Sequence, residues 1–296
     1  MAGTRLADGS LAEDVAAQEK WLTREAKARG YASIDELAEK NYKAFENLAK
    51  LWREKHPADA LLSRASSQTA NQRTTGFDKA SGTVIADFKN DNPLKAHVDY
   101  KAAKSGDVDA AARLVQALVK PESLEAAKDV FGDGVIYVPV HAEEASGRNK
   151  IPDALAAHYA ANAGGEFGAG IMQANRAYHT GASAMERLLA RAGFSGKIDP
   201  GRRYVLVDDV TTMGSTLADL ASYIRGQGGE VAGSVVLVNA ARSGKMIPES
   251  KTIKELEARH GQEIRKLFGV DPSALTWSEP ALYVRIGGTL SVTITL

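Results

Sequence analysis

The second half of the chain alternates short apolar runs with segments whose apolar positions recur at helical spacing. The apolar runs predict strands at 135–140, 170–173, 204–207 and 231–238, with two more at 282–286 and 290–296. Helical spacing predicts helices at 152–163, 184–192 and 251–268, and another that begins near Leu217. Continuous apolar runs are typical of strands buried on both faces, and their alternation with helices is typical of a parallel sheet. The pattern therefore predicts an α/β fold with a parallel sheet flanked by helices.

The N-terminal region carries a different pattern, that of two amphipathic helices. The first is predicted at 10–28, and the second begins at Ser33, where Glu36 completes a capping box. Gly30 separates the two helices and Pro57 ends the second. The apolar positions of the second helix are Ile34, Leu37, Ala38, Phe45, Leu48, Ala49 and Trp52. Two interpretations stay open, which are an accessory helical cap and an arm for oligomerisation or partner binding.

The region between these two patterns is mixed. Residues 64–82 are polar and aperiodic, and they predict a linker or a long surface loop. A strand is predicted at 83–88, and helices are predicted at 108–119 and 124–130. We therefore expect three parts, namely a helical extension at 1–63, a linker at 64–82 and an α/β domain at 83–296.

Composition restricts the classes of protein to which the chain can belong. Lys plus Arg and Asp plus Glu both number 37, so no net charge draws the chain to nucleic acid or to an anionic membrane. The absence of cysteine excludes disulfides, cysteine-ligated zinc and cysteine nucleophiles. No apolar stretch has the length of a membrane span, and the N-terminus lacks the apolar core of a signal peptide. We expect a cytoplasmic protein with no nucleic-acid or membrane partner.

The most informative segment is 205–217, which reads Val-Leu-Val-Asp-Asp-Val-Thr-Thr-Met-Gly-Ser-Thr-Leu. An apolar strand is followed by Asp208 and Asp209, then by a turn rich in hydroxyl side chains, then by a helix. The start of a helix offers free backbone N–H groups and a positive dipole end to a phosphate. The two carboxylates suit a sugar diol and a hydrated divalent cation. A ribose 5-phosphate needs both halves of this arrangement at once.

This segment resembles the signature of type I phosphoribosyltransferases, which bind phosphoribosyl pyrophosphate (PRPP). The family pattern is an apolar strand, two acidic residues, two variable positions and a Thr/Ser-rich turn that contains Gly. The chain departs from it at Met213, where many members carry Thr or Ala, but the backbone N–H is retained. The alternative is an ordinary parallel strand that ends in two aspartates, as in other doubly wound folds. Such a strand has no need of the hydroxyl cluster.

The resemblance implies a role for several residues. Asp208 and Asp209 would be catalytic, holding the ribose hydroxyls and, through water, Mg2+ as the cofactor. The 5-phosphate would be bound by Thr211, Thr212, Met213, Gly214, Ser215 and Thr216. In the family, a loop that follows an earlier buried strand grips the pyrophosphate. Here that loop is 141–150, and the implied pyrophosphate-binding residues are Ser146, Gly147, Arg148 and Lys150. The alternative for this loop is a solvated polar connection with ordinary charges.

A second loop, at 164–180, lies where type I members carry a mobile loop that closes over the reaction and excludes water. Its Arg176 is the third candidate catalytic residue, with an ordinary surface arginine as the alternative, and His179 is a further polar group there. The glycines of this loop do not form a dinucleotide fingerprint, because no clear strand precedes them. The helix at 251–268 is expected to cover the core or to form part of the small hood that the family places over the nucleophile.

The resemblance implies a type I phosphoribosyltransferase-like fold and a Mg2+-dependent enzyme. The expected reaction transfers the 5-phosphoribosyl group of PRPP to a nitrogenous base or similar small-molecule acceptor and releases pyrophosphate. A homodimer is expected. The alternative function is a protein on the same fold that senses PRPP or nucleotides without turnover, which Met213 and the helical N-terminal arm leave open.

Overall fold

The structure is a computed structural model of the 296-residue chain. It describes residues 21–32, 72–140, 143–144, 147–168, 170–173, 191–241 and 243–280, with isolated positions between 36 and 51. The chain forms two compact units, one made of 1–70 with 178–190 and the other of 71–177 with 191–296. Each unit is described by itself below.

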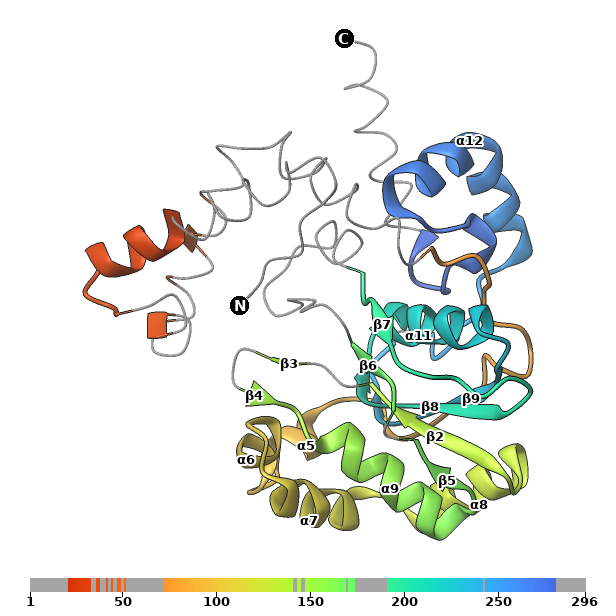
Figure 1. The fold of residues 1–296 in the computed structure, drawn as a ribbon, viewed down its shortest axis with the longest axis horizontal. Helices are drawn as coiled ribbons and strands as arrows, with labels where there is room; N and C mark the ends of the chain where they lie inside the picture. The colour runs from red at the N-terminus through yellow and green to blue at the C-terminus, as the bar shows by residue number, and fades with distance from the viewer. Residues whose placement is uncertain are drawn as a thin grey trace. The chain divides into compact units, whose positions relative to one another are not determined.

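The second unit is built on a five-stranded sheet in which every strand runs parallel to its neighbours. The strand order across the sheet is β1 (Val84–Phe88), β9 (Glu230–Asn239), β8 (Arg203–Thr211), β2 (Val135–Pro139) and β5 (Glu166–Phe167). The predicted α/β fold with a parallel sheet is therefore confirmed. Figure 1 shows the sheet with helices on both sides.

Helices cover both faces of this sheet. One face carries α5 (Asn92–Ala96), α6 (Tyr100–Lys104), α7 (Val108–Leu118), α8 (Pro121–Phe131) and α9 (Ile151–Ala163). The other face carries α11 (Ser215–Gly226) (Figure 1). Successive side chains of a strand point to opposite faces of the sheet, so both faces carry part of the hydrophobic core. Tyr137 of β2 packs against the helices of the first face, and its neighbour Val138 packs against α11. The sheet is thus buried on both faces, which explains its continuous apolar runs.

The order of the strands creates a switch point between β2 and β8. After β2 the chain passes through α9 on one face and returns as β5, on the far side of β2 from β8. After β8 it passes through α11 on the opposite face and returns as β9, on the other side of β8. Because the two crossovers diverge, the carboxyl ends of β2 and β8 are the place where folds of this kind form a ligand-binding crevice. Ligands of open parallel sheets bind at such a crevice.

Smaller elements complete the unit. Two short antiparallel hairpins pair β3 (Glu143–Glu144) with β4 (Gly147–Arg148), and β6 (Met172–Gln173) with β7 (Phe194–Ser195). A long helix, α12 (Ser250–Phe268), is followed by the 3-10 turn η2 (Pro272–Ala274). The structure confirms the strand predicted at 83–88 and the helices predicted at 108–119, 124–130, 152–163 and 251–268. The helix predicted at 124–130 starts earlier, at Pro121.

The prediction that residues 170–173 form a strand of the main sheet was wrong. The sheet strand that follows α9 is β5, inside the segment interpreted as a loop, while Met172 and Gln173 belong to the separate hairpin with β7. Gly164 and Gly165, with φ of +86° and +128°, reverse the chain immediately after α9, so it re-enters the sheet within two residues. A strand that short has no periodicity to detect.

Other predictions fall partly outside the described residues. Of the helix predicted at 184–192, only residues 191 and 192 are described, and they are not helical. The strands predicted at 282–286 and 290–296 lie wholly outside the described residues. Helices α5 and α6 were not predicted, because five residues are too few for a periodic pattern.

Residues 72–82 are largely exposed, as expected of a surface loop, but three of their side chains are buried. Arg73 is 1% exposed, and Phe77 and Ser81 are also buried. The Arg73 N–H donates to the Gly269 carbonyl at 2.9 Å, and the Asp271 N–H donates to the Arg73 carbonyl at 2.8 Å. The buried polar side chains of Arg73 and Ser81 have partners far along the chain, namely Asp219 and Glu279 for Arg73 and Arg225 for Ser81, and no local pattern records such contacts.

The first unit contains helical residues at 21–28 and an apolar cluster. Its buried members are Leu22, Ala26, Leu37 and Leu48. Leu37 and Leu48 are two of the apolar positions predicted for the second helix. The Ala32 N–H donates to Glu36 Oε2 at 2.5 Å, whereas the predicted capping box needs the N–H of Ser33, which lies outside the described residues. Trp52 and the first helix before residue 21 lie outside the described residues.

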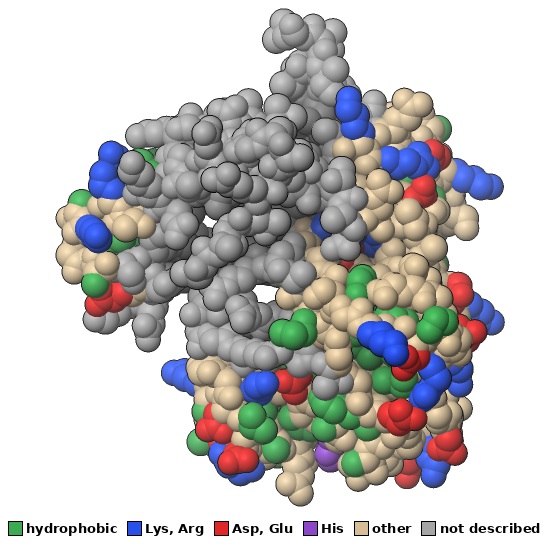
Figure 2. All heavy atoms as spheres, viewed as in Figure 1, with side chains coloured by type: hydrophobic (Ala, Val, Ile, Leu, Met, Phe, Trp, Pro, Cys, Tyr) green, Lys and Arg blue, Asp and Glu red, His purple; other side chains and the backbone are tan. Residues whose placement is uncertain are grey.

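Charged side chains of both signs are interspersed over the described part of the face drawn in Figure 2. This mixture agrees with the equal numbers of basic and acidic residues. Among the helices that the structure describes, none combines the length and apolar character needed to cross a membrane.

Candidate functional site at the switch point

The acidic pair lies where β2 leaves the sheet. Pro139, the last residue of β2, is in register with Val207 of β8, and the Val140 N–H donates to the Val207 carbonyl at 2.8 Å. Asp208 and Asp209 come next in β8, which continues to Thr211 beside β9 alone. The pair therefore stands at the carboxyl-end crevice between β2 and β8, as the sequence predicts for a ligand site.

Asp209 is buried, and protein donors hold both of its oxygens. Its Oδ2 lies 3.0 Å from Lys104 Nζ and accepts a hydrogen bond of 3.2 Å from Asn149 Nδ2. Its Oδ1 accepts from the Val210 N–H at 3.0 Å. Burial alone would raise the pKa of Asp209, but the charge of Lys104 and the hydrogen bonds from Lys104 and Asn149 lower it. Asp209 is thus an ionised carboxylate with an internal counter-ion.

Asp208 differs from its neighbour, because its side chain is only partly buried. Its Oδ1 accepts from the Asp209 N–H at 2.9 Å. Burial and the adjacent charge of Asp209 raise the pKa of Asp208 well above its ordinary value. Two neighbouring carboxylates with shifts in opposite directions are typical of a functional site. Asp208 is the member of the pair that is more open to solvent.

The predicted pyrophosphate loop contacts the acidic pair through Asn149, next to its last residue Lys150. Asn149 is buried, and its Oδ1 accepts from the Ile151 N–H at 3.1 Å while its amide group binds Asp209. Lys150 forms an ion pair of 3.0 Å with Asp153, in the first turn of α9, so this predicted pyrophosphate ligand already has an anionic partner. Gly147 and Arg148 form β4, and Ser146 lies outside the described residues.

The predicted phosphate-binding turn joins β8 to the N-terminus of α11. Thr211 ends β8 in register with Asn239, and Thr212 is exposed. Gly214 adopts a left-handed conformation with φ of +74°, and its carbonyl accepts from the Ala218 N–H at 2.9 Å. Helix α11 then begins at Ser215 and continues for 12 residues. The turn therefore presents the start of a helix beside the acidic pair, as an anion site requires.

The segment that follows η2 contacts this turn and helps to hold its backbone in place. Thr276 Oγ1 donates to the Met213 carbonyl at 2.7 Å. Glu279 is fully buried and accepts from the Thr276 N–H at 2.7 Å and from Arg73 Nη2 at 2.7 Å. The Ser215 side chain contributes to lowering the pKa of the Glu279 carboxyl group. The backbone of the turn is therefore held in place by residues near both ends of the second unit.

A divalent cation fits this site through Asp208. Mg2+ in phosphate sites is commonly held by one or two carboxylates, several waters and the substrate's phosphates. The described residues contain no group of three or more His, Asp or Glu side chains arranged to hold a metal. Asp209 already accepts three protein donors, whereas Asp208 is the more accessible carboxylate. The donor set suits a cation held mainly by Asp208, water and a phosphorylated ligand.

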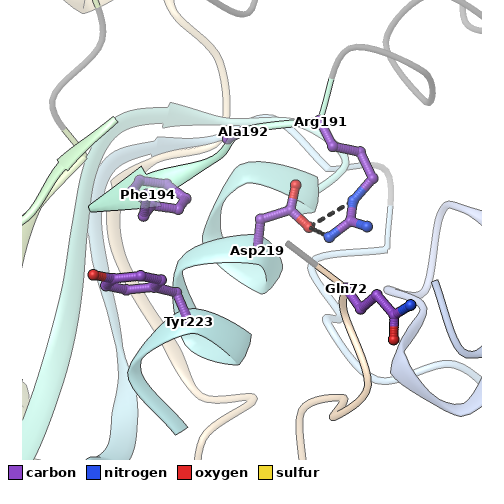
Figure 3. Close-up of a pocket in the computed structure, with 6 residues that line it drawn as sticks. All are labelled: Gln72, Arg191, Ala192, Phe194, Asp219 and Tyr223. Atoms are coloured by element: carbon purple, nitrogen blue, oxygen red, sulfur yellow. Dashed lines mark hydrogen bonds and ion pairs between the residues drawn. The ribbon is translucent and has the colours of Figure 1, made fainter. Parts of the chain in front are cut away.

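A separate pocket lies beside α11 and is not a stronger candidate. It is lined by Gln72, Arg191, Ala192, Phe194, Asp219 and Tyr223 (Figure 3). Its cavity volume is about 20 Å3, far below the ~300–1,000 Å3 of typical small-molecule sites. Asp219 Oδ1 accepts from Arg191 Nη2 at 2.6 Å, so the charged groups of the pocket already neutralise each other. The Phe194 and Tyr223 rings lie 6.2 Å apart between centroids.

The structure brings the acidic pair, the turn 211–216 and residue 150 to the same edge of the sheet. Arg176 and His179 lie outside the described residues, so their predicted roles stay predictions. Sequence reasoning missed four residues of the site, which are Lys104, Asn149, Thr276 and Glu279. Only Asn149 had a local signal, since it stands between Arg148 and Lys150. The other three come from segments that gave no sign of chemistry.

Comparison with known proteins gives partial matches. No protein-family model matches the chain. It is 34% identical over 186 residues to protein TraN of Escherichia coli, which covers 61% of this chain and 42% of the relative. It is also 34% identical over 130 residues to an uncharacterized protein of Haemophilus influenzae, covering 44% of this chain and 29% of the relative. The chain thus spans less than half the length of these curated relatives.

Among solved structures, the chain has a distant likeness to adenine phosphoribosyltransferase from Rhodothermus marinus. The TM-score is 0.28 and the sequence identity 17%, over 43% of this chain and 71% of that protein. A likeness this weak carries no argument about activity. The candidate site therefore stands on the geometry of the chain itself, which combines an acidic pair, a helix N-terminus and a switch point in a parallel α/β sheet.

Proposed function

We propose that the chain is a phosphoribosyltransferase that binds PRPP across the carboxyl ends of β2 and β8. The observation that carries the proposal is the position of Asp208 and Asp209, which stand at the switch point directly before the glycine turn that opens α11. The helix N-terminus suits the 5-phosphate, and the partly exposed Asp208 suits the ribose hydroxyls. A ribose 5-phosphate carries a phosphate and sugar hydroxyls in one molecule, so it suits the helix N-terminus and Asp208 together.

The proposed reaction is a displacement at C1 of the ribose. The bond from C1 to the pyrophosphate oxygen breaks, and its electron pair leaves with pyrophosphate. A nitrogen lone pair of the acceptor forms the new bond to C1, and the acceptor loses its N–H proton to solvent. Asp208, the accessible carboxylate of the pair, is proposed to face the positive charge that develops on the ribose ring, which would lower the barrier electrostatically, with Asp209 beside it.

The remaining binding groups orient the ligand and neutralise the leaving group. The turn 211–216 anchors the 5-phosphate, which is remote from C1, so its binding energy can be used for orientation. Residues 146–148 and Lys150 are proposed to bind the pyrophosphate, for which Lys150 would exchange its contact with Asp153. Mg2+, when bound through Asp208, would supply further charge neutralisation on pyrophosphate. Arg176 is proposed to close the site against water.

The second candidate is a sensor that binds PRPP or a nucleotide without turnover. The observation that favours it is the saturation of Asp209 by Lys104, Asn149 and the Val210 N–H. A carboxylate locked in this way serves as a fixed part of a binding surface and has fewer free lone pairs for a reacting sugar. Both candidates require the same ligand, and they differ in pyrophosphate release.

Calorimetric titration with PRPP, followed by a pyrophosphate-release assay with a panel of nitrogenous bases, tests both candidates. Asp208→Asn should abolish release and weaken PRPP binding, because it removes the accessible carboxylate. Asp199→Asn is the matched control, since Asp199 is an exposed aspartate before the amino end of β8. PRPP binding without release for every base would favour the sensor. Failure of the unaltered protein to bind PRPP would overturn both candidates.

A further inference from the structure

Arg73 is a buried charge that the proposed reaction does not use. Its side chain is 1% exposed, its Nη2 donates to Glu279 Oε1 at 2.7 Å, and its Nε lies 3.4 Å from Asp219 Oδ1. Asp219 belongs to α11, the helix whose N-terminus is proposed to bind the phosphate. One guanidinium group therefore contacts both this helix and the segment that follows η2.

The backbone around Arg73 is fixed independently of its side chain. Arg73 is hydrogen-bonded through its N–H to Gly269 and through its carbonyl to Asp271. Gly76 passes so close to η2 that the Ser273 carbonyl leaves no room for a Cβ atom there. Arg225, near the end of α11, donates to the Gly76 carbonyl at 2.6 Å. The guanidinium group therefore reaches Glu279 from an anchored position.

A chain of hydrogen bonds leads from Arg73 to the turn 211–216. Arg73 donates to Glu279 Oε1, and Glu279 Oε2 accepts from the Thr276 N–H at 2.7 Å. Thr276 Oγ1 then donates to the Met213 carbonyl at 2.7 Å. Glu279 and Thr276 are both fully buried, so water does not compete with their contacts. A displacement of Arg73 is thus transmitted to the backbone of the turn.

The last hydrogen bond of this chain orients one peptide group of the turn. The Met213 carbonyl and the Gly214 N–H belong to the same peptide unit, which is planar and trans, so the two groups point in opposite directions. Because Thr276 holds the carbonyl on one side, the N–H is directed to the other. Among the described residues this N–H has no acceptor. It lies directly before α11, whose first N–H groups suit an anion.

We propose that Arg73 is a positioning residue of the phosphate site, which acts through Glu279 and Thr276 to aim the Gly214 N–H at the bound 5-phosphate. The inference rests on the proposed function, and Arg73 itself makes no contact with the ligand. A guanidinium group suits this role because its planar fork can hold Glu279 and Asp219 at once, whereas an ammonium group is a single point charge.

Calorimetric titration of the full chain with ribose 5-phosphate tests this role, because that ligand carries the 5-phosphate without the pyrophosphate. Arg73→Lys keeps a positive charge beside Glu279 and should lower the affinity at least about threefold, part of the effect of one hydrogen bond to a charged group. Arg191→Lys is the matched control, since Arg191 is also buried and pairs with Asp219 at 2.6 Å (Figure 3), outside the chain of contacts through Glu279. It should lower the unfolding temperature and leave the affinity unchanged.

A double variant shows whether Arg73 acts through Thr276. Thr276→Val removes the hydrogen bond to the Met213 carbonyl without altering a buried charge. Arg73→Lys should lower the affinity for ribose 5-phosphate in the unaltered protein but have no further effect in the Thr276→Val variant. Equal losses in both backgrounds would show a general structural effect and overturn the inference. Thermal unfolding of each variant shows that the compared proteins are folded.

Hydrogen exchange of the unaltered protein gives a test that needs no substitution. Because coupling is reciprocal, ribose 5-phosphate should slow exchange at the Arg73 and Thr276 N–H groups more than at the Lys120 N–H, which donates to Asp87 of β1. Equal slowing at the three groups overturns the role of Arg73, as does an unchanged affinity of Arg73→Lys. Either result, together with normal PRPP binding, leaves the proposed function intact. An unaltered protein that binds neither PRPP nor ribose 5-phosphate overturns both.

Discussion

Arg73 and Glu279 are 206 positions apart in the sequence, yet Arg73 Nη2 donates a hydrogen bond of 2.7 Å to Glu279 Oε1. Both side chains are buried, at 1% and 0% exposure. The same carboxylate accepts from the Thr276 N–H, and Thr276 Oγ1 donates to the Met213 carbonyl in the turn before α11. One buried ion pair therefore ties the first and last described segments of the second unit to the predicted phosphate-binding turn.

Glu279→Gln should destabilise the second unit strongly. The substitution leaves the buried guanidinium of Arg73 with less compensating charge, and breaking a buried pair in this way costs about 3–5 kcal/mol. Glu257→Gln is the matched control, because Glu257 pairs with Arg265 on the surface, where both side chains are more than 40% exposed. That change should cost less than about 1 kcal/mol. Urea denaturation at neutral pH measures both, and equal effects would contradict the assigned importance of the buried pair.

The contribution of Glu279 should also depend on pH. Burial would raise the pKa of Glu279, but the charge and hydrogen bond of Arg73, with the Thr276 and Ser215 contacts, lower it overall. A lowered pKa contributes stability that is fully present above the unfolded-state value of about 4.3 and is lost as the pH falls through the folded-state value. The difference in unfolding free energy between the unaltered protein and Glu279→Gln should therefore be constant near neutrality and shrink in acid. A difference that grows in acid would contradict this sign.

Gly214→Ala should weaken both the fold and the binding of phosphorylated ligands. Its left-handed φ of +74° costs a non-glycine residue roughly 1–2 kcal/mol. A Cβ atom would also lie 2.5 Å from Met246 Cε and 2.8 Å from its Sδ, so the methionine must move. Gly226→Ala is the control at the other end of α11, where a Cβ meets nothing within 4 Å. It should be neutral or stabilise by about 0.5–1 kcal/mol. Thermal unfolding and PRPP titration compare the two.

Thr276→Val should loosen the turn without removing a residue that contacts ligand. It deletes the hydrogen bond from Thr276 Oγ1 to the Met213 carbonyl while keeping the shape of the side chain. The expected cost is about 1 kcal/mol of stability, with a loss of PRPP affinity. Thr276→Ser keeps the hydroxyl and should behave like the unaltered protein in affinity. If the valine and serine variants bind PRPP equally, the brace has no effect on the site.

Two truncated chains locate the start of the α/β unit. A chain of residues 71–296 keeps Arg73, Phe77 and Ser81, all buried, and should fold with its PRPP site preserved. A chain of residues 83–296, cut at the end of the predicted linker, lacks them and should unfold at lower temperature. Circular dichroism, PRPP titration and light scattering compare the two, the last because removal of the helical extension can expose an apolar face. A folded 71–296 chain without PRPP binding would place the extension in the active site.

Local sequence patterns predicted the elements whose burial can be inferred from residues close together in the chain. The central residues of β2, β8 and β9 are buried on both faces of the sheet, so these strands contain nearly continuous apolar runs. Helices α7 and α9 are long enough for helical spacing to repeat. The two-residue β5 and the five-residue α5 and α6 are not, so their structure follows from the partners that they meet.

The sequence by itself determined the parallel α/β architecture and the order of strand, acidic pair, glycine turn and helix at 205–217, because these depend on periodicity and on residues adjacent in the chain. Only the tertiary structure decided which distant side chains complete the site. Lys104 and Asn149 meet Asp209 because the strand order brings β2 beside β8, and Thr276 meets Met213 because the chain after η2 returns to the turn before α11. Such contacts depend on the topology of the whole sheet, and no short stretch of sequence contains it.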